Sequence, residues 1–249
     1  MKFYCFPRRQ VIAFSILFLM FSGIVFGSEQ MLMIGDFSTS DAESGVPEGW
    51  EQLTFKKIDR HTRYELVRED GTVVVKAASN ASASGLIRKI RIDPKEYKFL
   101  TWRWKITNIL RKGDATKKEG DDFPARLWVN FEYDPRKLNL LERVKYEATR
   151  LIYGEYPPLC AITYVWGSKT PKRSVVPSAY SDKAVSVIVE SGESRLNQWI
   201  EVTRNIYEDY RTVFQADPPP ISGIAIMTDT DNTGESAIAY YGNIVLRKP

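Results

Sequence analysis

Residues Phe99–Ile106, with the sequence FLTWRWKI, alternate between apolar and polar side chains. Successive side chains of a β-strand point to opposite faces of its sheet. One face of this segment therefore carries Leu100, Trp102, Trp104 and Ile106, and the other face carries polar and charged side chains. The pattern predicts a strand whose tryptophans lie in a hydrophobic core.

Strand-like sequence patterns continue on both sides of this segment. Short stretches of alternating or β-branched character are separated by turn residues, which favours a sandwich or a barrel. The sequence predicts an all-β fold, an antiparallel jelly-roll-like β-sandwich with one inserted amphipathic helix. The expected strands are Met31–Phe37, Tyr64–Arg68, Thr72–Ala77, Gly85–Ile92, Phe99–Ile106, Ala125–Phe131, Ala161–Gly167, Ala184–Glu190, Trp199–Asn205, Gly223–Thr228 and Ser236–Leu246.

The inserted helix is expected over Leu138–Tyr153, where the alternating pattern typical of strands stops. Apolar residues recur there at helical spacing, with charged residues of both signs between them. Pro157 and Pro158 end the insertion, because proline cannot donate a backbone hydrogen bond to a continuing helix. The apolar positions are Leu141, Val144, Ala148, Leu151 and Ile152.

The N-terminus has the layout of a secretory signal. Lys2, Arg8 and Arg9 precede Val11–Phe26, an apolar run without charge that is shorter than the roughly 20 residues of a spanning helix. We expect cleavage after Gly27, which gives a signal peptide over residues 1–27, a single domain over residues 28–249 and a periplasmic location. The alternative is an uncleaved anchor, so membrane contact is expected only through this segment.

Loss of the signal changes the charge and the cysteine content. Residues 1–27 carry three positive charges, so the formal net charge falls from +4 to +1. A nearly neutral domain lacks the basic face that nucleic-acid binding requires, and we exclude that function. Cys160 is then the only cysteine and His61 the only histidine, so neither a disulfide nor a Cys–His nucleophile is expected.

A first candidate site is the segment Asp229–Glu235, with the sequence DTDNTGE. Asp229, Asp231 and Thr233 offer oxygen atoms at alternate positions, as calcium loops do. The alternative is a β-turn in which these side chains bind the local backbone. Calcium is therefore the one cofactor that the sequence suggests.

A second cluster precedes the strand Ala125–Phe131. Asp121 and Asp122 stand at its entrance and Arg126 just inside. These carboxylates have three candidate roles. They can act as acid and base on a glycoside, form a structural ion pair with Arg126, or complete the site in the Asp229–Glu235 segment.

Aromatic side chains beside polar ones suggest a carbohydrate surface, because rings stack on sugars while polar groups bind hydroxyls. Trp128 shares a strand face with Arg126 and Asn130, opposite the apolar face of that strand. The alternative is that such rings belong to the core. The ligand-binding candidates are Arg126, Trp128, Asn130, Asp121, Asp122, Tyr164, Trp166, Glu201, Arg204 and Asp209.

Several stretches together resemble the domain-of-unknown-function 3047 family of exported bacterial proteins. The resemblance covers about Met31 to Leu246 and implies a jelly-roll-like sandwich of one domain. It implies no catalytic residues, because the family has no established activity. The stretches are Ser84–Ile87 (SGLI), Trp102–Lys105 (WRWK), Asp121–Arg126 (DDFPAR), Tyr164–Gly167 (YVWG), Arg204–Tyr210 (RNIYEDY) and Asp229–Thr233 (DTDNT).

The functional prediction is an exported module that binds carbohydrate or another cell-envelope glycan. One alternative is a polysaccharide hydrolase that pairs Asp122 with Glu201 or Asp229, or a lyase that uses Arg126 and Tyr164. The other alternative is an envelope scaffold that contacts a protein partner. The sequence contains no phosphate-binding glycine loop, nucleophile-elbow serine or zinc-binding histidine set, which argues against those chemistries.

Overall fold

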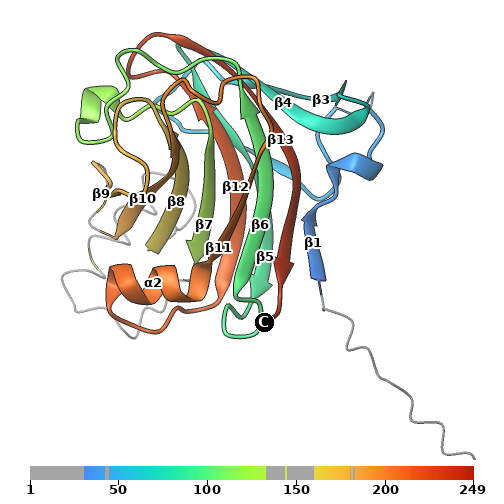
Figure 1. Cartoon of the computed structure of the whole chain (residues 1–249), viewed down its shortest axis with the longest axis vertical. Helices are drawn as coiled ribbons and strands as arrows, with labels where there is room; N and C mark the ends of the chain where they lie inside the picture. The colour runs from blue at the N-terminus through green and yellow to red at the C-terminus, as the bar shows by residue number, and fades with distance from the viewer. Residues whose placement is uncertain (1–30, 43–44, 133–143, 145–159, 180, 182) are drawn as a thin grey trace, which may run out of the picture.

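The computed structural model describes residues 31–42, 45–132, 144, 160–179, 181 and 183–249. Two β-sheets pack face to face around one core (Figure 1). The mostly β sandwich predicted from the sequence is therefore confirmed. The signal segment and nearly all of the helix expected over Leu138–Tyr153 lie outside the described residues. No helix in the described ranges is long and apolar enough to cross a membrane.

The first sheet, sheet A, has six strands in the order β11-β6-β13-β4-β3, and β1 pairs with β13. Every pairing in this sheet is antiparallel. Its strands are β1 (Met31–Gly35), β3 (Arg63–Glu69), β4 (Thr72–Asn80), β6 (Phe99–Ile106), β11 (Ile200–Asn205) and β13 (Ser236–Arg247).

The second sheet, sheet B, has seven strands in the order β2-β5-β12-β7-β8-β10-β9. β8 and β10 pair in parallel, which departs from the expected antiparallel sheet, and the other pairings are antiparallel. Its strands are β2 (Glu51–Leu53), β5 (Ala83–Ile92), β7 (Arg126–Phe131), β8 (Cys160–Gly167), β9 (Val175–Pro177), β10 (Ala184–Ser191) and β12 (Ile221–Asp229).

All eleven predicted strands are present, most with ends shifted by one to three residues. β2 and β9 were not predicted, because they have three residues each and are too short for an alternating pattern. The helix α2 (Ile206–Phe214) was not predicted either. The finer jelly-roll assignment remains a prediction.

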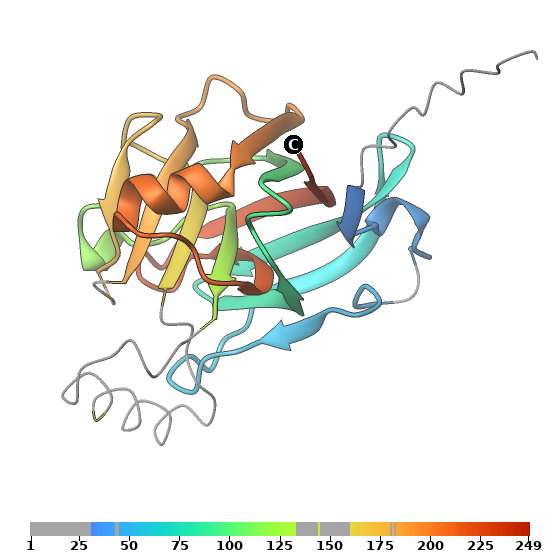
Figure 2. The ribbon, with the colours of Figure 1, turned by 90° about the horizontal axis from the view of Figure 1, so that it is seen from below.

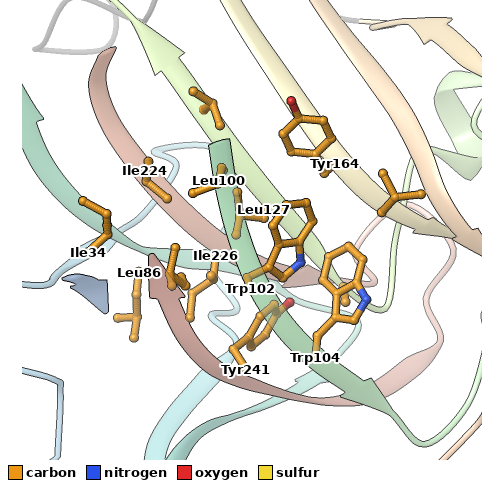
Figure 3. Close-up of a cluster of buried hydrophobic side chains, with 14 of the residues drawn as sticks. Ile34, Leu86, Leu100, Trp102, Trp104, Leu127, Tyr164, Ile224, Ile226 and Tyr241 are labelled. Atoms are coloured by element: carbon orange, nitrogen blue, oxygen red, sulfur yellow. The ribbon is translucent and has the colours of Figure 1, made fainter. Parts of the chain in front are cut away.

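Aromatic side chains of the two sheets meet in the middle of the sandwich (Figure 3). Trp102 of β6 lies 5.2 Å from Tyr164 of β8 between ring centroids, and Trp104 lies 6.3 Å from Trp166. Trp102 and Trp104 also contact each other edge to face. These four rings are almost fully buried, as the alternation in β6 predicts for its two tryptophans.

The helix α2 closes one end of the sandwich, below the sheets in Figure 1 and across them in Figure 2. Tyr210 packs against Phe131, at the end of β7, with ring centroids 4.6 Å apart. Asn205 caps the helix, because its side chain accepts a hydrogen bond from the backbone N–H of Glu208. The opposite end of β7, where Arg126 lies, is therefore the far end of the sandwich.

Candidate functional site

The two acidic clusters predicted from the sequence come together at the end of the sandwich opposite α2. β7 and β12 are antiparallel neighbours, and Arg126 stands opposite Met227 in their register. The start of β7 therefore lies beside the end of β12, which is Asp229. We call Asp121, Asp122, Arg126, Asp229 and Asp231 the acidic cluster.

Arg126 forms the centre of the acidic cluster. Its Nε donates to Asp229 Oδ1 at 2.6 Å, and its Nη2 donates to Asp229 Oδ2. Nη2 also donates to the backbone oxygen of Asp121 at 2.5 Å, and Nη1 lies 3.7 Å from Asp121 Oδ1. The guanidinium sits 4.5 Å from the ring of Phe123. This two-pronged arrangement fixes the carboxylate of Asp229 in one orientation.

Asp122 connects the segment before β7 to the turn after β12 through hydrogen bonds from the backbone of that turn. Its Oδ2 accepts a hydrogen bond from the backbone N–H of Thr233 at 2.6 Å, and its Oδ1 accepts one from Asn232 at 3.3 Å. Gly234 closes the turn at a φ of 69°, a conformation that glycine adopts without strain. The segment Asp229–Glu235 thus forms a turn held by a carboxylate from the other cluster.

The acidic cluster concentrates negative charge where water is largely excluded. Burial raises the pKa of Asp229, of Asp121 and of Asp231, and neighbouring carboxylates add to each rise. Arg126 opposes the rise at Asp229, and its own pKa is raised by these carboxylates despite its burial. The buried carboxylates of Asp121, Asp122 and Asp229 therefore surround one guanidinium.

Three members of the acidic cluster could hold a cation. One carboxylate oxygen each from Asp122, Asp229 and Asp231 lies within 4.8 Å of the others. Hard cations such as Ca²⁺ bind such oxygen sets. Thr233, the third ligand expected from the sequence, instead accepts a bond from Glu235 N–H at its hydroxyl and one from Lys112 Nζ at its carbonyl.

The sequence patterns did not predict the residues whose hydrogen bonds stabilise this end of the molecule. Glu235 accepts hydrogen bonds from the backbone N–H groups of Arg111 and Lys112, at 3.0 and 2.8 Å. Thr230 Oγ1 lies 2.8 Å from Ser79 Oγ, inside a buried group of hydroxyls. No local pattern marks such contacts, because the partners are more than 100 residues apart.

The outer face of β7 carries Arg126, Trp128 and Asn130. The core contains the alternate residues of this strand, so these three side chains point away from it. Trp128 is partly exposed, and its ring lies 6.0 Å from the Arg126 guanidinium. Its neighbours in register are Ala225 on β12 and Thr163 on β8, which are both small.

The remaining ligand candidates lie elsewhere. Tyr164 and Trp166 are core residues. At the α2 end, the Tyr164 hydroxyl donates to Asp209 at 2.7 Å, and Arg204 donates to the same carboxylate at 2.5 and 2.9 Å. Burial raises the pKa of Tyr164. Glu201 is exposed on β11 of sheet A, opposite Arg103.

This geometry does not place any of the residue pairs considered for catalysis together in an accessible site. Asp122 and Asp229 are close together, but their residues are 1% and 2% exposed, so a polysaccharide cannot reach them. Glu201 lies on β11 of the other sheet and is exposed, whereas Asp122 is buried. Arg126 points outward from sheet B whereas Tyr164 points into the core, which separates the pair considered for a lyase.

Comparisons with known proteins identify a family but no activity. Among solved structures, the chain is similar to the K1 cleaved adhesin domain of Lys-gingipain from Porphyromonas gingivalis W83, with 10% identity and a TM-score of 0.39. That similarity covers 88% of this chain and 99% of the other. No curated protein matches the chain. The family model described as "Protein of unknown function (DUF3047)" matches residues 48–245, and the chain therefore belongs to this family.

Proposed function

We propose that this chain is an exported carbohydrate-binding module whose ligand is a glycan of the bacterial envelope. Its binding surface is the outer face of β7, around Trp128. The observation that carries the proposal is the position of this tryptophan, which points away from the core and is partly exposed. An exposed indole beside polar groups suits a sugar, whose apolar face stacks on the ring while its hydroxyls bind the polar groups.

The other tryptophans of the chain have structural roles. Trp50, Trp102, Trp104 and Trp166 are buried in the core. Trp199 lies on the side of sheet A, where its ring stacks 4.6 Å from the Arg103 guanidinium and its Nε1 donates to Asp70 at 2.9 Å. Trp128 and Trp199 are both partly exposed, and Trp128 is the one whose indole donates no hydrogen bond to another side chain within the described residues. Arg126 and Asn130 flank it along the strand on the same face, and both are buried.

Binding to a glycan array and to purified cell-wall polysaccharides tests the proposal. We expect the protein to retain specific glycans, and we expect Trp128→Ala to weaken binding at least about tenfold. Trp199→Ala is the matched control, because it removes an indole from the other sheet and leaves binding unchanged. Trp128→Phe keeps an aromatic ring, so it separates a loss of binding from a loss of folding. Circular dichroism checks the fold of each variant. Absence of glycan binding by the wild type, or unchanged binding by a folded Trp128→Ala, overturns the proposal.

We also propose that the acidic cluster binds calcium through Asp122, Asp229 and Asp231. The support is the convergence of three carboxylates on one point and the excess of buried carboxylates over guanidinium groups there. A divalent cation offsets that excess and removes the need for protons on these groups. The cation would then stiffen the turn after β12 rather than contact the glycan, because the site lies at the end of the strand and two of its three carboxylates are buried.

A further inference from the structure

Four apolar side chains gather on the outer face of sheet A, at the end of the sandwich where α2 lies. Strand register sets Phe99, Arg247 and Met31 in one row across β6, β13 and β1, and it sets Val245 beside Met33 in the next row of the same face. The alternate residues of these strands belong to the core or pack against it, so these side chains point outward. We call Met31, Met33, Phe99 and Val245 the apolar patch.

The methionines are the most exposed part of the apolar patch. Met31 is 58% and Met33 37% exposed, and Phe99 and Val245 are partly exposed. Elsewhere in the described ranges, the exposed large apolar residues are single valines on three different segments, which is ordinary on a protein surface. Apolar residues grouped on one face instead mark a contact surface. The single valines are Val46, Val144 and Val175.

Three cations, Lys98, Arg247 and Lys248, border the apolar patch. Arg247 stands between the patch residues of β6 and β1 in register, Lys98 directly precedes Phe99, and Lys248 directly follows Arg247. Lys248 Nζ lies 3.6 Å from Glu96 Oε2, with both side chains partly exposed. An exposed pair of this length adds little free energy, so these cations can bind an anionic partner.

Two tyrosine rings lie beside the lysines. Lys98 Nζ lies 5.3 Å from the ring centroid of Tyr207, the second residue of α2, and Lys248 Nζ lies 5.1 Å from that of Tyr97. Both tyrosines are partly exposed. Tyrosine and lysine side chains next to exposed apolar ones are typical of protein surfaces at the boundary between lipid headgroups and acyl chains.

The position of the apolar patch in the chain also indicates lipid. Met31 follows the apolar run Val11–Phe26 by five residues. Five extended residues span about 17 Å, so a bilayer that holds this run during export lies within that distance of the patch. The patch is at the end of the sandwich where α2 and the C-terminus lie (Figure 1), and the acidic cluster is at the opposite end. Anionic lipids would repel the acidic cluster, which therefore faces away from them.

We propose that the apolar patch and its three cations dock this chain on a bilayer that contains anionic phospholipids. The methionines enter the boundary of the acyl chains, and the cations bind the lipid phosphates. Methionine suits a fluid partner because its side chain adapts to irregular surroundings. This contact adds to the membrane contact through residues 1–27 that the sequence predicts. It uses sheet A, so it is independent of glycan binding on the outer face of β7.

Co-sedimentation with vesicles tests the proposal. Both sheets and the core lie within residues 31–249, so the test uses the chain from Ser28 onward, the form that export is expected to release. Vesicles of phosphatidylglycerol and phosphatidylcholine in equal parts should bind it at least about tenfold more tightly than phosphatidylcholine alone, and salt should weaken binding. A double variant, Met31→Ser with Met33→Ser, should bind at least about tenfold more weakly. Val175→Ser removes an exposed apolar side chain from β9 of the other sheet and should bind as the wild type does.

A second double variant tests the cations separately. Lys98→Gln with Lys248→Gln should remove most of the preference for anionic vesicles. Lys89→Gln with Lys117→Gln removes two exposed lysines elsewhere and should retain the preference. Trp128→Ala should bind vesicles as the wild type does, which separates this surface from the proposed glycan surface. Melting followed by circular dichroism checks that each variant is folded.

Several outcomes overturn the proposal. They are a wild type that does not bind anionic vesicles, unchanged binding by either folded double variant of the patch, and an equal loss in Val175→Ser. A dimer in analytical ultracentrifugation that Met31→Ser with Met33→Ser dissolves also overturns it, because the apolar patch then binds a second copy of the chain. None of these outcomes bears on glycan binding, so the two proposals fail separately.

Discussion

Arg126 and Asp229 form a buried, two-pronged ion pair between residues 103 positions apart in the chain. The pair joins the start of β7 to the end of β12. Asp121 shares the same guanidinium through its backbone oxygen and its carboxylate. Neither charge is tolerated there without the other, because an unpaired buried charge is costly.

Removal of Arg126 should therefore destabilise the fold strongly. We expect Arg126→Met to lower the free energy of unfolding by about 3–5 kcal/mol, because Asp229 and Asp121 lose their counter-charge. Urea denaturation followed by tryptophan fluorescence measures the change. Arg211→Ala is the control, since its contacts with Glu208 at 3.8 Å and with Asp217 at 3.7 Å are both exposed, and it should cost less than about 1 kcal/mol. Equal stabilities of the two variants would contradict the central role of Arg126.

Calcium should stabilise the protein through the acidic cluster. We expect the melting temperature to rise with added Ca²⁺ and to fall with chelator, since a ligand at 100 times its Kd adds about 2.7 kcal/mol. Asp231→Asn should abolish the rise, and this residue is chosen because it is only partly buried. Asp217→Asn, at the other end of the sandwich, is the control and should respond as the wild type does. A melting temperature indifferent to Ca²⁺ rejects the proposed ion.

The N-cap of α2 should contribute measurably to stability. Asn205→Ala removes the acceptor for the Glu208 N–H and should cost about 1 kcal/mol in the free energy of unfolding. Asn205→Asp keeps an acceptor at the same place and should cost much less. Equal losses in the two variants would show that the capping bond is not responsible.

Asp70 should titrate below the usual range for an aspartate. Hydrogen bonds from Trp199 and from Lys105, together with the Lys105 charge, lower the pKa of Asp70. Because the folded-state pKa is lowered, these contacts stabilise the fold above the ordinary pKa of aspartate, and the contribution is lost as the pH falls through the lowered value. We expect Trp199→Phe to raise the pKa of Asp70, as followed by the NMR shift of its carboxyl carbon. No change in this variant would contradict the contact.

The helix α2 was not predicted, although the sequence contains signals for its start. Asn205, Glu208 and Asp209 are a cap and two first-turn acids, which are start signals for a helix. They follow directly on the strand β11, so no turn separates the strand from the start of the helix. α2 also depends on packing between Tyr210 and Phe131, a contact that the sequence does not display.

The sequence by itself determined the sandwich and the face of its best-patterned strands. The alternation in Phe99–Ile106 and in Ala125–Phe131 assigned Trp102 and Trp104 to the core and Trp128 to the opposite face, because strand geometry has a strict period of two. Only the tertiary structure determined which residues come together in the acidic cluster and at the α2 end. Strand register set Arg126 beside Asp229, and it placed Tyr164 in the core with its hydroxyl on Asp209 at the other end. Register depends on which strands pair, and no local pattern in the sequence records that choice.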